Sequence, residues 1–325
     1  MSLHTLQELT PASVLIFIKH HFCRANLLIV NTLVNCFFEF EGGQKAGAFK
    51  ARGALNTLLT LKEKNQLPER VIAYSSGNHA QAVAWAAQIL GIRATIFIPQ
   101  FASSIKIAAT KNYGAEVVLT RERQEAEDLA HALAKQHFLL PPYDHDDVIA
   151  GQGTAAFEAW AEEGGFDAVF APCGGGGLIS GTYLATRLFS NQAEVCAAEP
   201  LLANDAAQAY KTGVITRFFD TPMTLADGAR TLSVSARTLQ YIRLINHFYE
   251  IEEEDIARWT QWITHLLKVS IEPTAALGMA AAFKWLQNDQ TGRKILVILS
   301  GGNTDPTVYF KIWKTDYLEH FPLLT

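Results

Sequence analysis

From residue 70 onward, short apolar runs alternate with longer stretches in which apolar side chains recur at helical spacing. A run of four or five apolar residues is typical of a buried strand, whereas a 3.6-residue spacing is typical of a helix. The pattern predicts strands at residues 71–74, 94–98 and 116–119 and helices at residues 80–90, 103–112 and 124–137. Strands that alternate with helices in this way indicate a parallel sheet covered on both faces.

The same alternation resumes further along the chain. We expect helices at residues 155–163, 178–189, 254–267 and 274–286, and strands at residues 168–171, 195–198 and 294–299. Between the two series, residues 139–147 contain Pro141, Pro142 and a cluster of aspartate and histidine side chains. Such a break in the pattern indicates a boundary between two lobes of an α/β fold.

The first 45 residues show a weaker pattern. Residues 25–38 are strongly apolar, but the run is shorter than a bilayer span requires and Asn31 and Asn35 interrupt it, so we interpret it as buried strand or helix. Residues 37–41 alternate in part like a strand, and a helix is expected from Lys50 to about residue 64. No small-residue cleavage site follows the apolar run at residues 14–18, so no signal peptide is expected.

Composition narrows the class of protein. Of the 325 residues, 49% are hydrophobic and 18% charged, which is enough apolar material for a sizeable core. The net charge of −5 is dispersed, without the basic stripe of a nucleic-acid partner, and we expect no membrane partner. The four cysteines have no CxxC spacing, so we expect free thiols and a cytoplasmic location; they are Cys23, Cys36, Cys173 and Cys196.

Lys50 lies among small residues at the start of a predicted helix, in the stretch GAFKARGA at residues 47–54. Partial desolvation near a helix N-terminus lowers the pKa of a lysine, and the neutral amine forms Schiff bases with carbonyl compounds. The alternative is a solvated lysine at a helix start, as most lysines are.

Four consecutive glycines, Gly174, Gly175, Gly176 and Gly177, follow one predicted strand and open the next helix. Backbone N–H groups of such a loop converge on an anion, and the helix dipole favours negative charge, so a phosphate is the expected guest. A flexible turn is one alternative. A dinucleotide is another, because Gly175, Gly177 and Ser180 resemble the Rossmann fingerprint with Glu199 after the next strand, although Ser180 replaces its third glycine.

Two further polar turns follow predicted strands, where ligands of α/β sheets gather. The first offers donors for a carboxylate and a side chain for a ring oxygen, although an ordinary helix cap is the alternative; it contains Ser75, Ser76, Gly77, Asn78 and His79. The second begins at Ser300, whose hydroxyl suits a heterocyclic nitrogen, with a simple turn as the alternative. Glu199 and Asp205 offer oxygen ligands for Mg²⁺ or Ca²⁺. Lysine, phosphate loop and ring partners together describe pyridoxal phosphate.

With these motifs in order, the sequence resembles the fold-type II pyridoxal-phosphate enzymes of the serine racemase and threonine/serine dehydratase family. The matching stretches are residues 44–54, 75–81, 148–154, 174–177, 198–205, 226–228, 272–274 and 300–305. The resemblance implies two open, twisted, mostly parallel sheets covered by helices, as in the tryptophan synthase β subunit. It also implies a large cofactor-binding domain of residues 1–60 and 148–325, a small mobile domain of residues 61–147, and a homodimer.

The resemblance further implies a role for each motif. Lys50 would form the Schiff base, Phe49 would lie beside the ring, Asn78 would hold the ring 3′-oxygen, Gly174–Gly177 would bind the phosphate and Ser300 would face the pyridine nitrogen. Residues 75–79 would bind the substrate carboxylate. Glu199, the Ala203 carbonyl and Asp205 would bind the divalent cation.

The expected reaction is β-elimination or racemisation of a small hydroxy-amino acid such as serine, threonine or 3-hydroxyaspartate. Lys50 would take the α-proton on one face of the substrate, and Ser76 would act as acid or base on the other face. The alternatives are a β-replacement enzyme similar to cysteine synthase and, from another class, a nucleotide-binding module that uses the glycine loop.

Overall fold

The computed structural model describes residues 22–29, 32–287, 292–320 and 322. Internal contacts divide the described chain into two compact units. The first unit is residues 44–152, and the second comprises residues 22–43 together with the chain from residue 153 onward. The division differs from the expected domains in placing residues 44–60 and 148–152 with the smaller part. It does not test which parts move as bodies, so the domain assignment stays a prediction.

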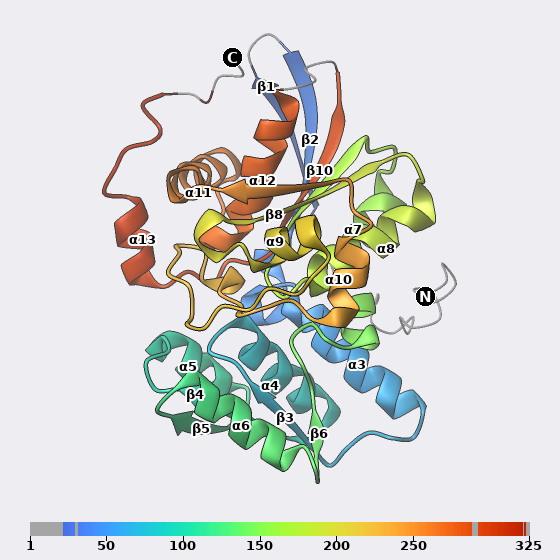
Figure 1. The fold of residues 1–325 in the computed structure, drawn as a ribbon, viewed down its shortest axis with the longest axis vertical. Coiled ribbons are helices and arrows are strands. Elements are labelled where there is room, and N and C mark those ends of the chain that lie inside the picture. The colour runs from blue at the N-terminus through green and yellow to red at the C-terminus, as the bar shows by residue number, and fades with distance from the viewer. Residues whose placement is uncertain (1–21, 30–31, 288–291, 321, 323–325) are drawn as a thin grey trace. The chain divides into compact units, whose positions relative to one another are not determined.

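A parallel sheet with strand order β5-β4-β3-β6 forms the centre of the first unit (Figure 1). The strands are β3 (Arg70–Tyr74), β4 (Arg93–Pro99), β5 (Glu116–Thr120) and β6 (Phe138–Leu139). The helices are α3 (Lys50–Glu63), α4 (Asn78–Leu90), α5 (Ser104–Asn112), α6 (Arg123–Leu133) and α7 (Asp146–Glu162), which continues into the second unit.

Both faces of this sheet are buried, which explains why its strands read as continuous apolar runs. Val71 and Ala73 pack in one cluster with alanines of α4 and leucines of α3, whereas Ile72, between them, packs against α6 on the other face. Successive side chains of a strand point to opposite faces, so a run without polar gaps is needed when helices cover both.

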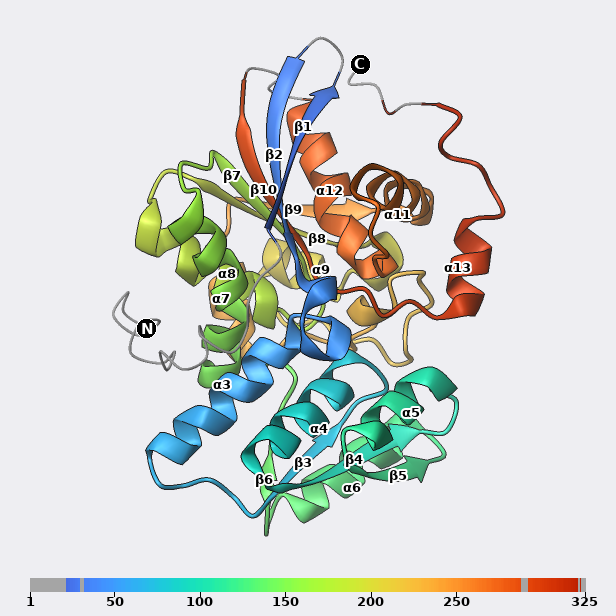
Figure 2. The ribbon, with the colours of Figure 1, turned by 180° about the vertical axis from the view of Figure 1, so that it is seen from behind.

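The second unit is built on a six-stranded sheet with the order β1-β2-β10-β7-β8-β9 (Figure 2). Only the pair of β1 and β2 is antiparallel. The strands are β1 (Phe22–Ile29), β2 (Thr32–Phe40), β7 (Ala168–Pro172), β8 (Glu194–Pro200), β9 (His247–Ile251) and β10 (Lys294–Leu299). The helices are α8 (Gly177–Phe189), α9 (Asp205–Thr212), α10 (Ala236–Ile242), α11 (Glu253–Leu267), α12 (Pro273–Leu286) and α13 (Pro306–Ile312).

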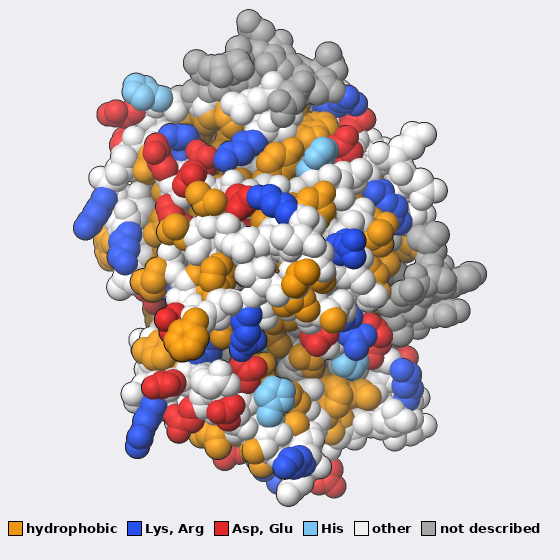
Figure 3. Space-filling view, in the orientation of Figure 1, with side chains coloured by type: hydrophobic (Ala, Val, Ile, Leu, Met, Phe, Trp, Pro, Cys, Tyr) orange, Lys and Arg blue, Asp and Glu red, His pale blue; other side chains and the backbone are white. Residues whose placement is uncertain are grey.

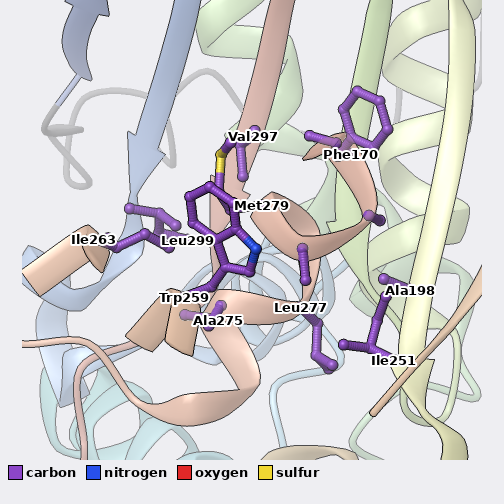
Figure 4. Packing of buried hydrophobic residues seen from close by; sticks show 14 of the residues in the cluster. Phe170, Ala198, Ile251, Trp259, Ile263, Ala275, Leu277, Met279, Val297 and Leu299 are labelled. Carbon is purple, nitrogen blue, oxygen red and sulfur yellow. The ribbon is translucent and has the colours of Figure 1, made fainter. Parts of the chain in front are cut away.

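Helix α12 lies against β7, β8 and β10, and its small side chains let it approach the sheet closely. Figure 4 shows Met279 and Leu277 of this helix among side chains of the sheet and Trp259 of α11. Leu277 and Met279 are fully buried, as is Val297 on β10. This core holds the carboxyl ends of β7, β8 and β10, and each of the three sequence motifs of this unit lies at one of those ends.

The fold class and nearly all predicted elements are confirmed. The apolar run at residues 25–38 is not one element but falls on two antiparallel strands, β1 and β2, and α7 begins at Asp146 instead of residue 155. The sequence did not indicate β6, α9, α10, β9 or α13. The apolar run at residues 14–18 lies outside the described residues.

The distribution of surface charge and the state of the cysteines can be compared with what the composition predicts. On the face shown in Figure 3, acidic and basic side chains are intermixed and apolar ones lie between them. Cys36, Cys173 and Cys196 are buried and carry no disulfide. Among the helices that the structure describes, none has both the length and the apolarity needed to cross a membrane.

Candidate active site

Lys50 is the first residue of α3, and a tight turn leads into that helix. Ala46 and Gly47 both have left-handed backbone angles, with φ of 58° and 66°, and Ala48 is extended. The Lys50 side chain is half-buried, and its Nζ donates a hydrogen bond to the Pro142 carbonyl at 2.6 Å. The same Nζ lies 4.9 Å from the centre of the Phe49 ring. The turn therefore presents one amine at the end of a rigid helix, with an aromatic ring beside it.

The Pro142 carbonyl that accepts this bond is itself held in place. Gln152 of α7 is buried and donates from Nε2 to the same carbonyl oxygen at 3.0 Å. Asn56 of α3 donates to the Asp147 carbonyl at 2.7 Å, which ties the start of α7 to α3. Lys50 thus faces a backbone acceptor fixed by two helices, a contact that nothing in the sequence indicated.

The turn after β3 carries the second motif of the first unit. Its Ser75 amide continues the sheet by donating to the Phe97 carbonyl at 3.1 Å, and the Ser75 hydroxyl accepts from the Gly77 amide at 3.2 Å. Ser76 is exposed, and Asn78 is half-buried at the start of α4. The turn therefore offers one accessible hydroxyl two residues after the end of a buried strand.

His79 closes this turn and is a neutral, structural imidazole. Burial, and to a lesser extent the nearby Lys50 charge, lower the pKa of His79 to about 3. Its Nε2 lies 2.9 Å from the Leu140 carbonyl, which can only accept, so Nε2 carries the proton. The buried Nδ1 is then an acceptor without a partner among the described residues. His79 thereby fixes the first turn of α4 to Leu140, the residue that follows β6.

The glycine loop joins β7 to α8 in the second unit. Gly176 has φ of +87°, and a Cβ there would lie 2.8 Å from Cδ1 of Ile242 and 2.9 Å from Cβ of Thr238. A Cβ on Gly174 would lie 3.2 Å from the Gly228 carbonyl. None of the amide groups of Gly174–Gly177 donates to a backbone carbonyl of the described residues. The loop therefore presents unused N–H groups at the positive end of a helix, as an anion site requires.

Hydroxyl groups surround this loop. Thr238 donates from Oγ1 to the Gly175 carbonyl at 2.9 Å. Thr274 accepts from the Gly228 amide at 2.9 Å, which holds the segment packed on Gly174. Thr231 lies next to Gly174, and its buried hydroxyl has no partner among the described residues. Thr231 and Thr238 were not singled out from the sequence, and Thr274 stood in a matching stretch without a role, because each comes from a part of the chain far from the loop.

Ser300 follows β10, and its side chain is 1% exposed with a hydroxyl that has no hydrogen-bond partner in the described chain. A buried hydroxyl without a partner costs free energy of the order of 1–3 kcal/mol, so such groups are usually found where a ligand completes them. Ser300 is thus available to a ligand atom that can donate or accept.

Glu199 is the last residue but one of β8 and Asp205 is the first residue of α9, and both are fully buried. One oxygen of Glu199 accepts from the Ala207 amide at 2.6 Å, whereas its other oxygen and both oxygens of Asp205 have no partner among the described residues. Burial raises the pKa of Asp205 to about 7; the Val234 amide opposes this shift but does not reach the carboxylate in hydrogen-bond geometry. Burial and the Asp205 charge raise the pKa of Glu199.

Unpaired buried carboxylate oxygens suit a hard cation. However, no group of three or more histidine, cysteine, aspartate or glutamate side chains in the described residues is arranged to hold a metal. A cation would therefore need backbone oxygens, such as that of the buried Ala203, in addition to the two carboxylates.

The structure thus groups the predicted residues in two sets. Lys50, Phe49 and residues 75–79 belong to the first unit, and the glycine loop, Ser300 and the two carboxylates belong to the second.

Comparison with known proteins shows to which family a chain with these features belongs. The family model described as "Pyridoxal-phosphate dependent enzyme" matches residues 23–301. The chain belongs to this family. Membership gives pyridoxal phosphate as the cofactor, and the residues fit it: a lysine amine for the aldehyde, free amides for the phosphate and an unpartnered hydroxyl for the ring.

Two curated relatives and one solved structure illustrate the similarity. The chain is 41% identical over 277 residues to L-threo-3-hydroxyaspartate ammonia-lyase of Saccharomyces cerevisiae, covering 84% of each protein. It is 42% identical over 273 residues to serine racemase of Schizosaccharomyces pombe, covering 83% of this chain and 84% of the relative. The structure of maize serine racemase matches with a TM-score of 0.86 and 32% identity, covering 98% of each chain. The predicted family, fold and enzymatic character are confirmed.

Proposed function

We propose that this enzyme eliminates water from a small β-hydroxy amino acid, so that hydrolysis releases a 2-keto acid and ammonia, and that it also racemises serine. The observation that carries the cofactor chemistry is the glycine loop, whose amides lack backbone acceptors at the start of α8. The names of the relatives support the reaction class, because they include an ammonia-lyase for 3-hydroxyaspartate and a serine racemase. Pyridoxal phosphate, when bound, supplies an electron sink that acidifies the substrate Cα–H bond.

Lys50 is proposed to bind the cofactor aldehyde and then to move the Cα proton of the substrate. A lysine suited to this task needs a neutral amine and a fixed position. The α3 helix supplies the position, and the Pro142 carbonyl supplies an acceptor for one N–H bond of the amine. Lys50 would take the proton from Cα and pass it to the β-hydroxyl, which then leaves as water. The enamine that is released takes up one water and yields a 2-keto acid and ammonia.

Residues 75–79 are proposed to bind the substrate carboxylate, with Asn78 holding the ring oxygen of the cofactor and Phe49 lying beside the ring. Ser76 is proposed as the acid or base on the substrate face opposite Lys50. Its exposure supports this role, because a group that exchanges protons with a substrate must be accessible. Inversion of Cα requires such a second group, whereas elimination through Lys50 does not.

Ser300 is proposed to face the pyridine nitrogen. A hydroxyl is neutral, so it does not hold a proton on that nitrogen as an aspartate would, and a weaker electron sink favours elimination and racemisation over transamination. The buried, unpartnered Oγ of Ser300 supports this assignment.

A divalent cation is proposed at Glu199, Asp205 and the Ala203 carbonyl. The support is electrostatic: two buried carboxylates with raised pKa values and three unpartnered oxygens would be neutralised by Mg²⁺ or Ca²⁺. The small mobile domain of residues 61–147, the homodimer and the cytoplasmic location stay predictions.

A panel of β-hydroxy amino acids tests the proposed function. The purified enzyme with pyridoxal phosphate should release 2-keto acid and ammonia from 3-hydroxyaspartate or L-serine, and chiral chromatography should detect D-serine formed from L-serine. If O-acetylserine and sulfide give cysteine while no β-hydroxy amino acid yields a keto acid, the enzyme is a β-replacement enzyme and the proposal is wrong.

A further inference from the structure

Thr238 connects the N-terminus of α10 to the glycine loop, 63 residues earlier in the chain. Its side chain is fully buried. The hydroxyl donates to the Gly175 carbonyl at 2.9 Å and accepts from the Ser235 amide at 3.2 Å. The Ser235 carbonyl, at 3.3 Å, is the poorer acceptor, and a threonine has a single hydroxyl proton, so the bond to Gly175 takes it.

This bond fixes the orientation of one peptide group in the loop. In a planar trans peptide, the carbonyl of Gly175 and the N–H of Gly176 point in opposite directions. Holding the carbonyl on the side of α10 therefore turns the Gly176 N–H toward the other side, where that N–H has no backbone acceptor.

The next peptide is held differently. The Gly176 carbonyl accepts from the amide of Ser180 at 3.0 Å and from its hydroxyl at 2.6 Å, so the helix itself fixes it. The Gly175 carbonyl precedes the helix, where glycine has most conformational freedom. Within the described chain, Thr238 is the hydrogen-bond donor to that carbonyl.

We propose that Thr238 is a positioning residue of the phosphate site: its hydroxyl orients the Gly175–Gly176 peptide so that the Gly176 N–H points at the cofactor phosphate. This inference rests on the proposed assignment of the glycine loop to the phosphate. It predicts that Thr238 contributes to binding of the phosphate group and not to binding of the rest of the cofactor.

Thr238 also serves in the capping box of α10, in which its amide donates to the Ser235 hydroxyl at 3.1 Å. Loss of that cap alone would destabilise α10 without changing which ligand the loop prefers. Ser235→Ala is therefore a matched control: it removes the cap acceptor, which also lies 3.2 Å from the Thr238 hydroxyl, and leaves that hydroxyl's bonds to the Gly175 carbonyl and the Ser235 amide in place.

The experiment compares pyridoxal phosphate with pyridoxal, which has the aldehyde and ring but no phosphate. Apoenzyme is titrated with each aldehyde, and Schiff-base absorbance gives the two dissociation constants. Thr238→Val should raise the dissociation constant of pyridoxal phosphate roughly fivefold to tenfold, which is the effect of losing one buried hydrogen bond. The dissociation constant of pyridoxal should not change. Thr238→Ser should restore the parent preference, and Ser235→Ala should keep it. Protection of apoenzyme by inorganic phosphate in a thermal shift assay should also weaken in Thr238→Val.

Gly176→Ala separates this inference from the assignment on which it rests. Its Cβ would fall 2.8–3.0 Å from atoms of Ile242 and Thr238, so it should abolish the preference for the phosphorylated aldehyde. If Gly176→Ala keeps that preference, the loop is not the phosphate site. If Gly176→Ala loses it while Thr238→Val keeps it, or if Thr238→Val weakens both aldehydes equally, Thr238 is only a cap and the inference is wrong.

Discussion

Gly151 tests how the structure holds Lys50 in place, because it lies where α7 packs against α3. A Cβ at Gly151 would lie 2.6 Å from the Arg52 carbonyl oxygen and 2.6 Å from Cβ of Asn56. Ordinary contact begins at 3.4 Å, so Gly151→Ala must separate the two helices by about 0.8 Å. The opposing atoms belong to the backbone or to a Cβ, and no rotamer change can relieve the contact.

Overpacking of this kind costs about 1–3 kcal/mol. The gain in helix propensity from glycine to alanine offsets at most about 1 kcal/mol. With a backbone atom as the obstacle, we expect Gly151→Ala to lower the free energy of unfolding by about 2 kcal/mol. Because α3 begins at Lys50, its displacement should also slow Schiff-base formation with pyridoxal phosphate.

Urea denaturation measures the first effect, and the rise of Schiff-base absorbance after mixing apoenzyme with cofactor measures the second. Gly278→Ala in α12 is the matched control, because its nearest neighbours would be a Val297 methyl at 3.2 Å and the Phe170 carbonyl at 3.4 Å. We expect that variant to stay within about 1 kcal/mol of the parent. If Gly151→Ala is as stable as Gly278→Ala and binds cofactor at the parent rate, the close approach of α3 and α7 does not position Lys50.

Three further predictions concern pH, stereochemistry and cations. The pKa of His79 in the folded protein, about 3, lies below the ordinary 6.5. The contribution of neutral His79 to the free energy of unfolding is therefore present above pH 6.5 and is lost as the pH falls toward 3. Urea denaturation should show that the free energy of unfolding falls by about 2 kcal/mol between pH 6.5 and 5, and that it does not fall in this way in His79→Gln. Ser76→Ala should abolish formation of D-serine but keep elimination from L-serine; equal racemisation in parent and variant would leave Ser76 only a binding role. Chelation at pH 8 should lower the thermal midpoint, Mg²⁺ should restore it, and Asp205→Asn should be insensitive to both; no response in the parent would show that the carboxylates hold no cation.

The sequence predicted most of the fold because both sheets are buried on two faces. Each of β3, β4, β7 and β10 reads as an apolar run, and the helices between them have clear apolar faces. The elements it missed are short or peripheral. Strand β9 lies at the sheet edge with an exposed His247, and α10 has seven residues. Segments this short contain too few apolar positions for their periodicity to be distinguished from that of a loop.

Some residues of the candidate site could likewise be predicted from the sequence, and others could not. Lysine, glycine and polar turns after strands are visible in the sequence because their residue types are unusual at those positions. The Pro142 carbonyl and the Thr238 hydroxyl were not visible, because every residue has a carbonyl and threonine is common at helix starts. Only the folded chain brings them to Lys50 and Gly175, which lie 92 and 63 residues away.

Borohydride reduction followed by peptide mass analysis tests whether Lys50 is the lysine that carries the cofactor. Reduction should fix pyridoxal phosphate to the single peptide that contains Lys50. The Lys50→Ala variant should lose the reducible absorbance band. The control variant Lys284→Ala, in which another half-buried lysine is replaced, should keep it. Labelling of any other lysine in the parent enzyme, or an unchanged band in Lys50→Ala, would show that Lys50 does not carry the cofactor.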